Sequence, residues 1–248
     1  MMHIKYLVTV ATLSMILVNC SSNTNAVFNH IPSEVYTSAR QKLQDGYYKE
    51  AIKELEILDN YYTLGTYTQQ IQLDLIYTYY KLYELKMSQI IINRFLHTNP
   101  NHPNIDYVLY IRGLINMVLD ESALPKLLFV GFNNSEQNPE YAHAAFRDFY
   151  QLIYYYPYSQ YAIDAKKHFI YLKDRLAKYE LSVVKYYHKR GAYIAVVNRV
   201  EQMLRHFPDT NSTYQALPYM ENAYQQLQLN GQAEKVANII RNFFSSNL

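Results

Sequence analysis

The residues best suited to bind a metal ion are two histidines and an aspartate in the stretch HTNPNHPNID. His97, His102 and Asp106 lie close together in sequence, but the histidines are five residues apart in a loop that contains proline. That spacing matches no helical pair of metal ligands, and loop histidines of this kind commonly serve as turn and capping residues. We therefore expect no metal site and no bound cofactor.

Other residues that could act in acid–base or nucleophilic catalysis lack the partners that such chemistry needs. The chain has one cysteine, Cys20, and it contains neither a Gly-rich phosphate loop nor an HExxH motif. Its close carboxylate pairs, Glu54 with Glu56 and Asp120 with Glu121, fall on helix faces or ends that we expect to be exposed. Charges at such positions usually increase solubility, so the sequence argues against an enzyme.

The single cysteine follows a segment with the features of an export signal. Residues 1–19 have a weakly basic start and then an apolar run that is too short to span a membrane, which is typical of a secretory signal peptide. With no second thiol for an internal disulfide, Cys20 could be a core residue, a nucleophile, half of an intermolecular disulfide, or a modified N-terminus. Leu17 and Val18 suit positions −3 and −2 of a lipoprotein cleavage site, whereas Asn19 replaces the small residue usual at −1.

After a polar linker over 20–32, apolar residues recur at the spacing of a helix, which predicts an all-α chain. The expected helices cover 33–45, 48–60, 66–82, 85–97, 104–120, 139–155, 159–189, 192–206, 211–229 and 231–245. Three glycines fall in gaps between consecutive helices, where a turn can use a positive φ: Gly46, Gly191 and Gly231. Three prolines fall in the alternate gaps, where proline ends a helix: Pro100, Pro157 and Pro208.

Three stretches of the chain align without gaps. They are GYYKEAIKELEILDNYYT (46–63), EYAHAAFRDFYQLIYYYP (140–157) and GAYIAVVNRVEQMLRHFP (191–208). In each, a small or β-branched residue precedes a large apolar one by four positions: Ala51 and Leu55, Ala145 and Phe149, Val196 and Val200. This pattern is typical of the second helix of a tetratricopeptide repeat, so we predict five helix pairs in a right-handed superhelical solenoid over 33–248.

The interval between repeats is longest around the third repeat, which predicts an inserted loop over 122–138. Its apolar residues indicate either that it packs back onto the solenoid or that it binds a partner. Charge is also uneven: 33–158 carries a net charge of −4, whereas 159–206 has ten basic and four acidic residues, a net charge of +6. Such a basic segment suits nucleic acid, an anionic membrane or an acidic protein, or it is a solvated helix face.

Several long strings in the chain resemble one family. QKLQDGYYKEAIKELEILDNYY, NPNHPNIDYVLYIRGLINM, LKDRLAKYELSV, IAVVNRVEQML and ALPYMENAYQQLQLNGQAEKVANII are similar to the D lipoprotein (BamD) family of the outer-membrane β-barrel assembly machinery, over about residues 4–245. The resemblance implies a non-catalytic protein of five tetratricopeptide repeats that faces the periplasm and is anchored in the outer membrane through lipidated Cys20. It implies no nucleic-acid partner.

The resemblance also implies where partners bind. Repeats over 159–248 would dock on the periplasmic domains of the central barrel subunit, with Arg199 facing a partner carboxylate and Lys185 and Arg190 beside it. Repeats over 33–100 would face unfolded client barrel proteins and accessory lipoproteins, with 101–158 as the middle repeat. The client groove maps to Asp45, Tyr48, Lys49, Tyr62, Gly65 and Tyr67.

The chain departs from the family pattern at two of these places. Thr63 replaces the usual proline after the second helix, and Lys49 replaces an arginine, which exchanges a forked donor for a point charge. For Arg199, a pair within the chain, with Glu201 or a neighbouring helix, is the alternative. For the whole protein, the alternatives are another exported repeat scaffold, for instance in peptidoglycan synthesis, and a periplasmic hydrolase, which the missing nucleophile–base pair disfavours.

Overall fold

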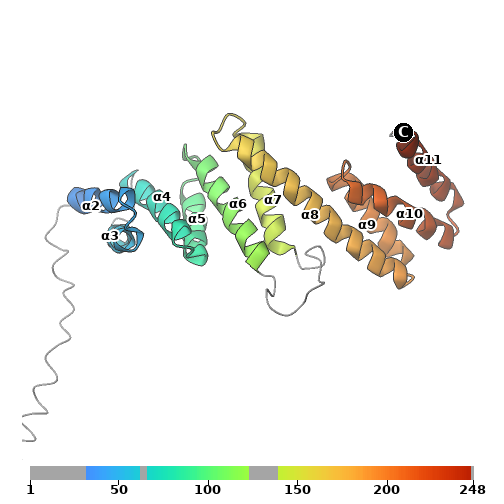
Figure 1. Ribbon diagram of the computed structural model, residues 1–248, viewed down its shortest axis with the longest axis horizontal. Helices are drawn as coiled ribbons and strands as arrows, with labels where there is room; N and C mark the ends of the chain where they lie inside the picture. Colours follow the sequence, from blue (N-terminus) through green and yellow to red (C-terminus); the bar gives the residue numbers. More distant parts are fainter. Residues whose placement is uncertain (1–31, 62–65, 123–138, 247–248) are drawn as a thin grey trace, which may run out of the picture. The chain divides into compact units, whose positions relative to one another are not determined.

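The computed structural model of this chain describes residues 32–61, 66–122 and 139–246. Within these ranges it has ten helices and no strand, which confirms the predicted all-α class (Figure 1). The helices are α2 (Pro32–Gln44), α3 (Tyr48–Tyr61), α4 (Thr66–Lys81), α5 (Leu85–Thr98), α6 (Ile105–Ser122), α7 (Glu140–Tyr155), α8 (Ala162–Lys189), α9 (Tyr193–His206), α10 (Asn211–Gln226) and α11 (Asn230–Ser246). Their ends lie within about three residues of those expected from apolar spacing.

Several of the predictions concern residues outside the described ranges. These are the signal peptide over 1–19, Cys20 and nearly all of the linker, Tyr62, Gly65, and the inserted loop apart from Ser122, the last residue of α6.

The helices pack in consecutive pairs, as a repeat fold requires. The chain divides into two compact units, Met1–Thr63 and Leu64–Leu248. In the first unit α2 packs on α3; in the second, α4 packs on α5, α6 on α7, α8 on α9 and α10 on α11. Within the second unit each pair also contacts the next, through α5 with α6, α7 with α8, and both α8 and α9 with α10.

The repeated small and large residues form the seams between paired helices. Ala51 and Leu55 of α3, Ala145 and Phe149 of α7, and Val196 and Val200 of α9 are all fully buried. A small residue lets the partner helix approach, and the large residue one turn later fills the space between helices. The predicted seam positions are therefore confirmed.

One close approach was not apparent from the sequence. Gly113 of α6 lies against the ring of Phe149 of α7, and a Cβ at this glycine would stand 2.6 Å from the ring's Cζ atom. Because real Cβ atoms do not come so close to a carbon atom, only glycine allows the two helices this spacing. The α6–α7 pair thus depends on a residue with no side chain.

Left-handed residues end several of the helices. Gly46 and Gly191 have φ values of 81° and 70°, as predicted. The prediction for Gly231 is wrong, because this residue is the second of α11 and the preceding turn instead uses Gln228, with φ 60°. Helix α10 ends at Gln226, earlier than expected, and the Leu229 N–H then donates to the Tyr224 carbonyl, which places the left-handed position at residue 228.

Two of the polar residues singled out above have structural roles. Asp120 was expected to be an exposed solubilising charge, but its side chain is 10% exposed and accepts two hydrogen bonds from Arg175 of α8, of 2.8 and 3.1 Å. That expectation is wrong because Arg175 reaches from α8 to this end of α6 and binds the carboxylate. His102 is a turn residue, as predicted: its Nδ1 accepts the Asn104 N–H at 3.1 Å, and burial lowers its pKa.

Candidate functional site

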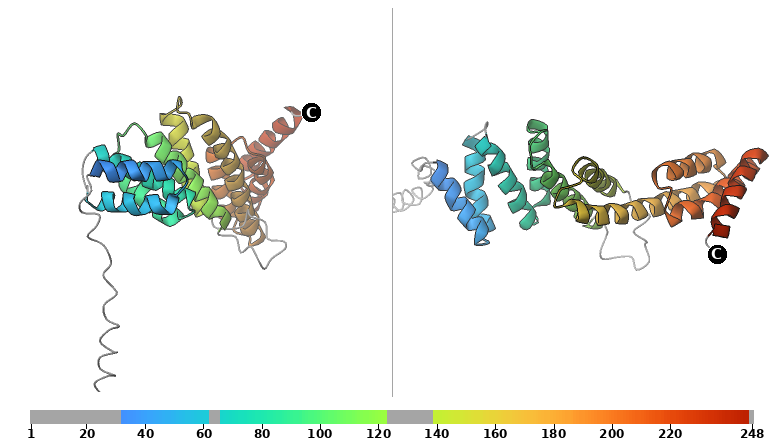
Figure 2. Two further views of the ribbon diagram at one scale, coloured as in Figure 1. Left: turned by 60° about the vertical axis from the view of Figure 1, so that its left-hand side comes forward. Right: turned by 90° about the horizontal axis from the view of Figure 1, so that it is seen from above.

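Helix α8 carries most of the basic segment found in the sequence. It is 28 residues long, twice the length of α9, and it packs on α7 near its start and on α9 and α10 further along. Figure 2 shows α8 extending alongside several other helices of the second unit. Apolar residues on one side of α8 are buried, so its charged residues and tyrosines gather on the sides that face solvent.

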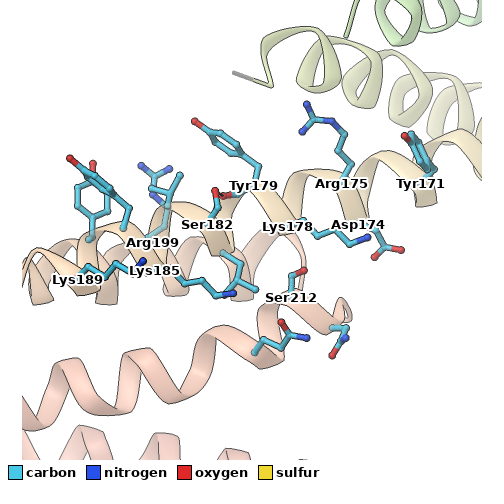
Figure 3. A pocket seen from close by; sticks show the side chains of 16 residues that line it. Tyr171, Asp174, Arg175, Lys178, Tyr179, Ser182, Lys185, Lys189, Arg199 and Ser212 are labelled. Carbon is cyan, nitrogen blue, oxygen red and sulfur yellow. Dashed lines mark hydrogen bonds between the residues drawn. The ribbon is translucent and has the colours of Figure 1, made fainter. Parts of the chain in front are cut away.

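A groove of about 1260 Å³ follows α8 where it meets α9 and α10 (Figure 3). Basic residues, tyrosines and uncharged polar residues make up most of its lining. The residues that determine which ligands the groove could bind include Lys178, Lys185, Lys189, Arg199, Tyr179 and Gln215. Asp174 is the one acidic residue among the described residues of the lining, so the groove is positively charged.

The groove extends over two sides of α8. In Figure 3, Tyr179 and Arg175 project from one side of the helix, whereas Lys178 and Asp174 project from the other, toward α10. The α10 wall contributes the side-chain amides of Asn211 and Gln215. Amides can hydrogen-bond an extended backbone and lysines can pair with carboxylates, so this lining suits an acidic protein segment.

An ion pair ties α8 to the start of α10. Lys173 of α8 contacts the carboxylate of Asp209, which lies two residues before α10 begins. This contact is the main reason that the pKa of Asp209 lies below its ordinary value. The pair holds the two walls of the groove together at one end.

Arg199, the residue expected to face a partner, lines the groove and has a partner within the chain. Its Nη1 donates to Oε2 of Glu180 at 3.0 Å; the Arg199 side chain is 33% exposed and that of Glu180 is 12% exposed. Glu180 belongs to α8, so this pair is the one with a neighbouring helix that the sequence left open. Glu201, the other candidate, lies 3.7 Å from Arg205 instead.

The two other predicted partner-binding residues differ in position. Lys185 is exposed and lines the groove beside Tyr186. Arg190 caps the C-terminus of α8, outside the lining, and its guanidinium lies over the Tyr186 ring, 5.3 Å from the centroid. Arg190 therefore does not line the groove itself, but it contacts Tyr186, which does. The structure brings Arg199 and Lys185 to one surface and places Arg190 at its edge.

Arg175 is the most buried cation of the groove. Its Nε and Nη2 bind Asp120, its side chain is 10% exposed, and its Nη1 is buried without a hydrogen-bond partner. Leaving one donor unsatisfied costs about 1–3 kcal/mol, which the two-pronged bond to Asp120 has to offset. Arg175 thus acts mainly as a brace between α6 and α8.

The residues of the expected client groove fall in both units. Asp45 lies in the turn after α2, where it accepts hydrogen bonds from Gln41 at 3.0 and 3.1 Å, and Tyr48 and Lys49 begin α3. These three belong to the first unit, whereas Tyr67 is the second residue of α4, is 45% exposed, and belongs to the second unit. Tyr62 and Gly65 lie outside the described residues.

Over residues 32–61, 66–122 and 139–246, no group of three or more histidine, cysteine or acidic side chains is placed to hold a metal ion. None of the helices in these ranges combines the length and the apolar character that crossing a membrane requires.

Sequence reasoning allowed Arg199 a partner on a neighbouring helix but did not identify Glu180, and it missed the amide wall of the groove. Glu180 was counted only as one of four acidic residues in the basic segment, although a buried glutamate on a basic helix indicates a nearby cation. Asn211 and Gln215 gave no signal, because uncharged polar residues are common at the start of a helix.

Comparisons with known proteins identify the family. A family model described as outer membrane lipoprotein, YfiO, matches residues 29–239. The outer membrane protein assembly factor BamD of Vibrio cholerae serotype O1 is 39% identical over 226 residues, which cover 91% of this chain and 93% of that protein. Proteins of the same name from Pasteurella multocida and Haemophilus influenzae are 36% and 34% identical, over 94% and 97% of this chain and 88% and 90% of their own.

These matches confirm the resemblance seen in the sequence, and they confirm the predicted location as an outer-membrane lipoprotein. The chain belongs to the YfiO family of outer membrane lipoproteins, together with the outer membrane protein assembly factors BamD.

Proposed function

We propose that this protein is a non-catalytic adaptor in outer-membrane protein assembly, which docks through the basic groove along α8 on the central barrel-forming subunit. The observation that carries the proposal is the lining of that groove, where Lys178, Lys185 and Arg199 lie among tyrosines and amides. The names of the relatives support a role in assembly, and the lining supports an acidic partner surface.

Arg199 is the residue through which we expect the partner to be recognised. Only one of its nitrogen atoms, Nη1, bonds Glu180, and a third of the side chain is exposed. A guanidinium has five N–H donors, so a partner carboxylate can bind the exposed edge in a bidentate way while Glu180 holds the other. Glu180 would then orient Arg199 for docking.

The tyrosines of the groove would provide contact area. Tyr171 and Tyr186 are 51% and 54% exposed, so about half of each side chain is available to a partner. Tyrosine loses little conformational entropy on binding and has both an apolar ring and a hydroxyl, so it is common at the energetic centre of interfaces. Lysines around these rings would speed encounter with an acidic partner.

At the other end of the chain, we propose that unfolded client segments and accessory lipoproteins bind near the α2–α3 turn. Asp45 and Lys49 are exposed there, and both belong to the first unit, as does Tyr48 at the start of α3. These three residues would bind an extended backbone with little demand on its sequence.

The docking proposal is tested by removing the guanidinium of Arg199. The amide of an Arg199→Gln variant ends two bonds short of the Nη1 atom that bonds Glu180, so the variant should lose some stability yet remain folded, and it should bind the purified central subunit at least about tenfold more weakly. Arg205→Gln is the matched control, since Arg205 is on the same helix, is 61% exposed, and lies outside the groove lining. Affinity would be measured by surface plasmon resonance, and folding by urea unfolding.

Equal affinity of both variants for the central subunit would reject docking through the groove. Co-purification of a cell-wall synthase in mild detergent, with no subunit of the assembly machinery, would instead favour the alternative of a peptidoglycan scaffold.

A further inference from the structure

The turn between α7 and α8 exposes large apolar side chains that the docking groove does not use. Tyr154, Tyr155, Tyr158 and Ile163 are 63%, 66%, 99% and 78% exposed; we call these four residues the tyrosine elbow. Single exposed apolar residues are common on protein surfaces, but four within ten residues form a patch, and patches mark interaction sites. The elbow lies at the upper ends of α7 and α8 in Figure 1.

The other side of this turn is firmly attached to α6. Ser159 donates a 2.6 Å hydrogen bond to Asp106, and the ring of Tyr161 stacks on Tyr110 with 4.8 Å between centroids. The Tyr110 hydroxyl in turn donates to Asp164 of α8 at 2.8 Å, and this bond is the main cause that lowers the pKa of Asp164. The elbow residues are therefore presented on a braced turn.

The exposed surface continues from the elbow along both helices. On α7, the ring of Tyr150 stacks on that of Tyr154, with 5.7 Å between the ring centroids. The Tyr150 ring also lies near the ring of Phe169 of α8, with 6.2 Å between centroids. On α8, Lys166 and Lys167 lie three and four residues after Ile163, so they share its helix face. The result is an apolar, tyrosine-rich tip with two exposed lysines one helical turn behind it.

We propose that the tyrosine elbow inserts into the surface of an anionic phospholipid bilayer. The most exposed residue, Tyr158, stands out from a turn, whereas a peptide-binding site would surround its ligand. Tyrosine places its ring among acyl chains and its hydroxyl among headgroups, which explains its enrichment at membrane interfaces. Lys166 and Lys167 stand where their ammonium groups can pair with lipid phosphates.

The family supplies the bilayer, because its members are outer membrane lipoproteins. A protein held at a membrane surface needs little further affinity for a few side chains to enter the interface. The elbow would then orient the second unit on that surface. This inference depends neither on the basic groove nor on its partner.

The chain contains no tryptophan, which makes a direct test possible. In a Tyr158→Trp variant, purified from membranes and reconstituted in vesicles of phosphatidylethanolamine and phosphatidylglycerol, the indole should emit at shorter wavelength than one in water. Replacing the lipids with ones brominated on the acyl chains should quench most of that emission. Tyr83→Trp is the matched control, since Tyr83 is 65% exposed in the α4–α5 turn and is absent from the elbow.

Two further variants separate the causes. Lys166→Glu with Lys167→Glu, in the Tyr158→Trp background, should remove most of the quenching by opposing the lipid phosphates. Arg199→Gln in the same background should leave the quenching unchanged, so failure of the docking proposal would not affect this result.

The inference is overturned if the indoles at positions 158 and 83 emit at the same wavelength and are quenched to the same extent. It is also overturned if the shift at position 158 requires the central subunit and does not respond to brominated lipid, since the elbow would then contact a protein.

Discussion

At the scale of single residues, backbone conformation decides which substitutions this chain tolerates. Gly191 has φ 70°, and a Cβ there would meet no atom within 4 Å, so the cost of a side chain comes from the backbone alone. Left-handed backbone costs a residue with a Cβ about 1–2 kcal/mol. Gln228 adopts this backbone at φ 60°, whereas Gly231, three residues later, is already part of helix α11.

We expect Gly191→Ala to lower the free energy of unfolding by about 1 kcal/mol, because alanine is strained at positive φ. Gly231→Ala, equally unhindered but helical, should be neutral or stabilise by up to about 1 kcal/mol. Gln228→Gly should stabilise by about 1 kcal/mol, since glycine relieves the strain. Urea unfolding of the three variants measures all of these changes, and an unaffected Gly191→Ala would contradict the backbone argument.

The same residues show what the sequence can and cannot reveal. Glycine in a gap between helices predicted the left-handed turns at Gly46 and Gly191, because few other residues adopt that backbone easily. The same rule gave a wrong prediction at Gly231, because the position of the left-handed residue depends on where α10 ends. Apolar spacing locates helix ends only to within a few residues. The need for glycine at position 113 arises from a ring 36 residues away and left no local pattern.

At the scale of helices, a buried ion pair links α6 to α8. Asp120 and Arg175 are each 10% exposed, so neither charge is well solvated without the other. Breaking a buried pair from one side typically costs about 3–5 kcal/mol, whereas replacing both partners with apolar residues is often neutral. The pair also positions Arg175 in the groove lining.

We therefore expect Arg175→Met and Asp120→Leu each to destabilise the protein by about 3 kcal/mol, and the double variant to recover most of that loss. A double-mutant cycle measured by urea unfolding gives the coupling directly. Additive effects of the two substitutions would show that the pair contributes no stability of its own.

Helix existence was predictable here, but helix-to-helix contacts were not. Every helix followed from apolar residues at helical spacing, and the burial of Leu55, Phe149 and Val200 followed from the repeat. Asp120 and Arg175, by contrast, are 55 residues apart, and Glu180 and Arg199 are 19 apart. The charge count correctly placed the positive charge in residues 159–206, but only the three-dimensional structure shows that Arg175 and Arg199 are already paired with acidic residues.

At the scale of the whole molecule, a net charge of +2 conceals a strongly basic segment. All of its lysines except Lys173 are exposed on α8, where salt can screen them. Raising the salt concentration from about 0.1 M to about 1 M shortens the screening length from about 10 Å to about 3 Å. A partner steered by this charge should therefore bind more slowly in high salt.

We expect the association rate with the central subunit to fall at least about tenfold over that range. Lys178→Gln with Lys185→Gln should flatten the salt dependence, whereas Lys81→Gln with Lys86→Gln, outside the groove, should leave it unchanged. Stopped-flow or surface plasmon resonance would measure the rates. A salt-independent rate would indicate that docking relies on apolar contact.

The unusual length of α8 has a consequence for distance. One continuous helix contains both Ile163, in the elbow, and Lys185, in the groove. At about 1.5 Å per residue, these two residues lie about 33 Å apart along its axis. If the elbow rests in the bilayer, α8 serves as a ruler that sets how far from the lipid the partner is held, and each added turn would lengthen it by about 5 Å.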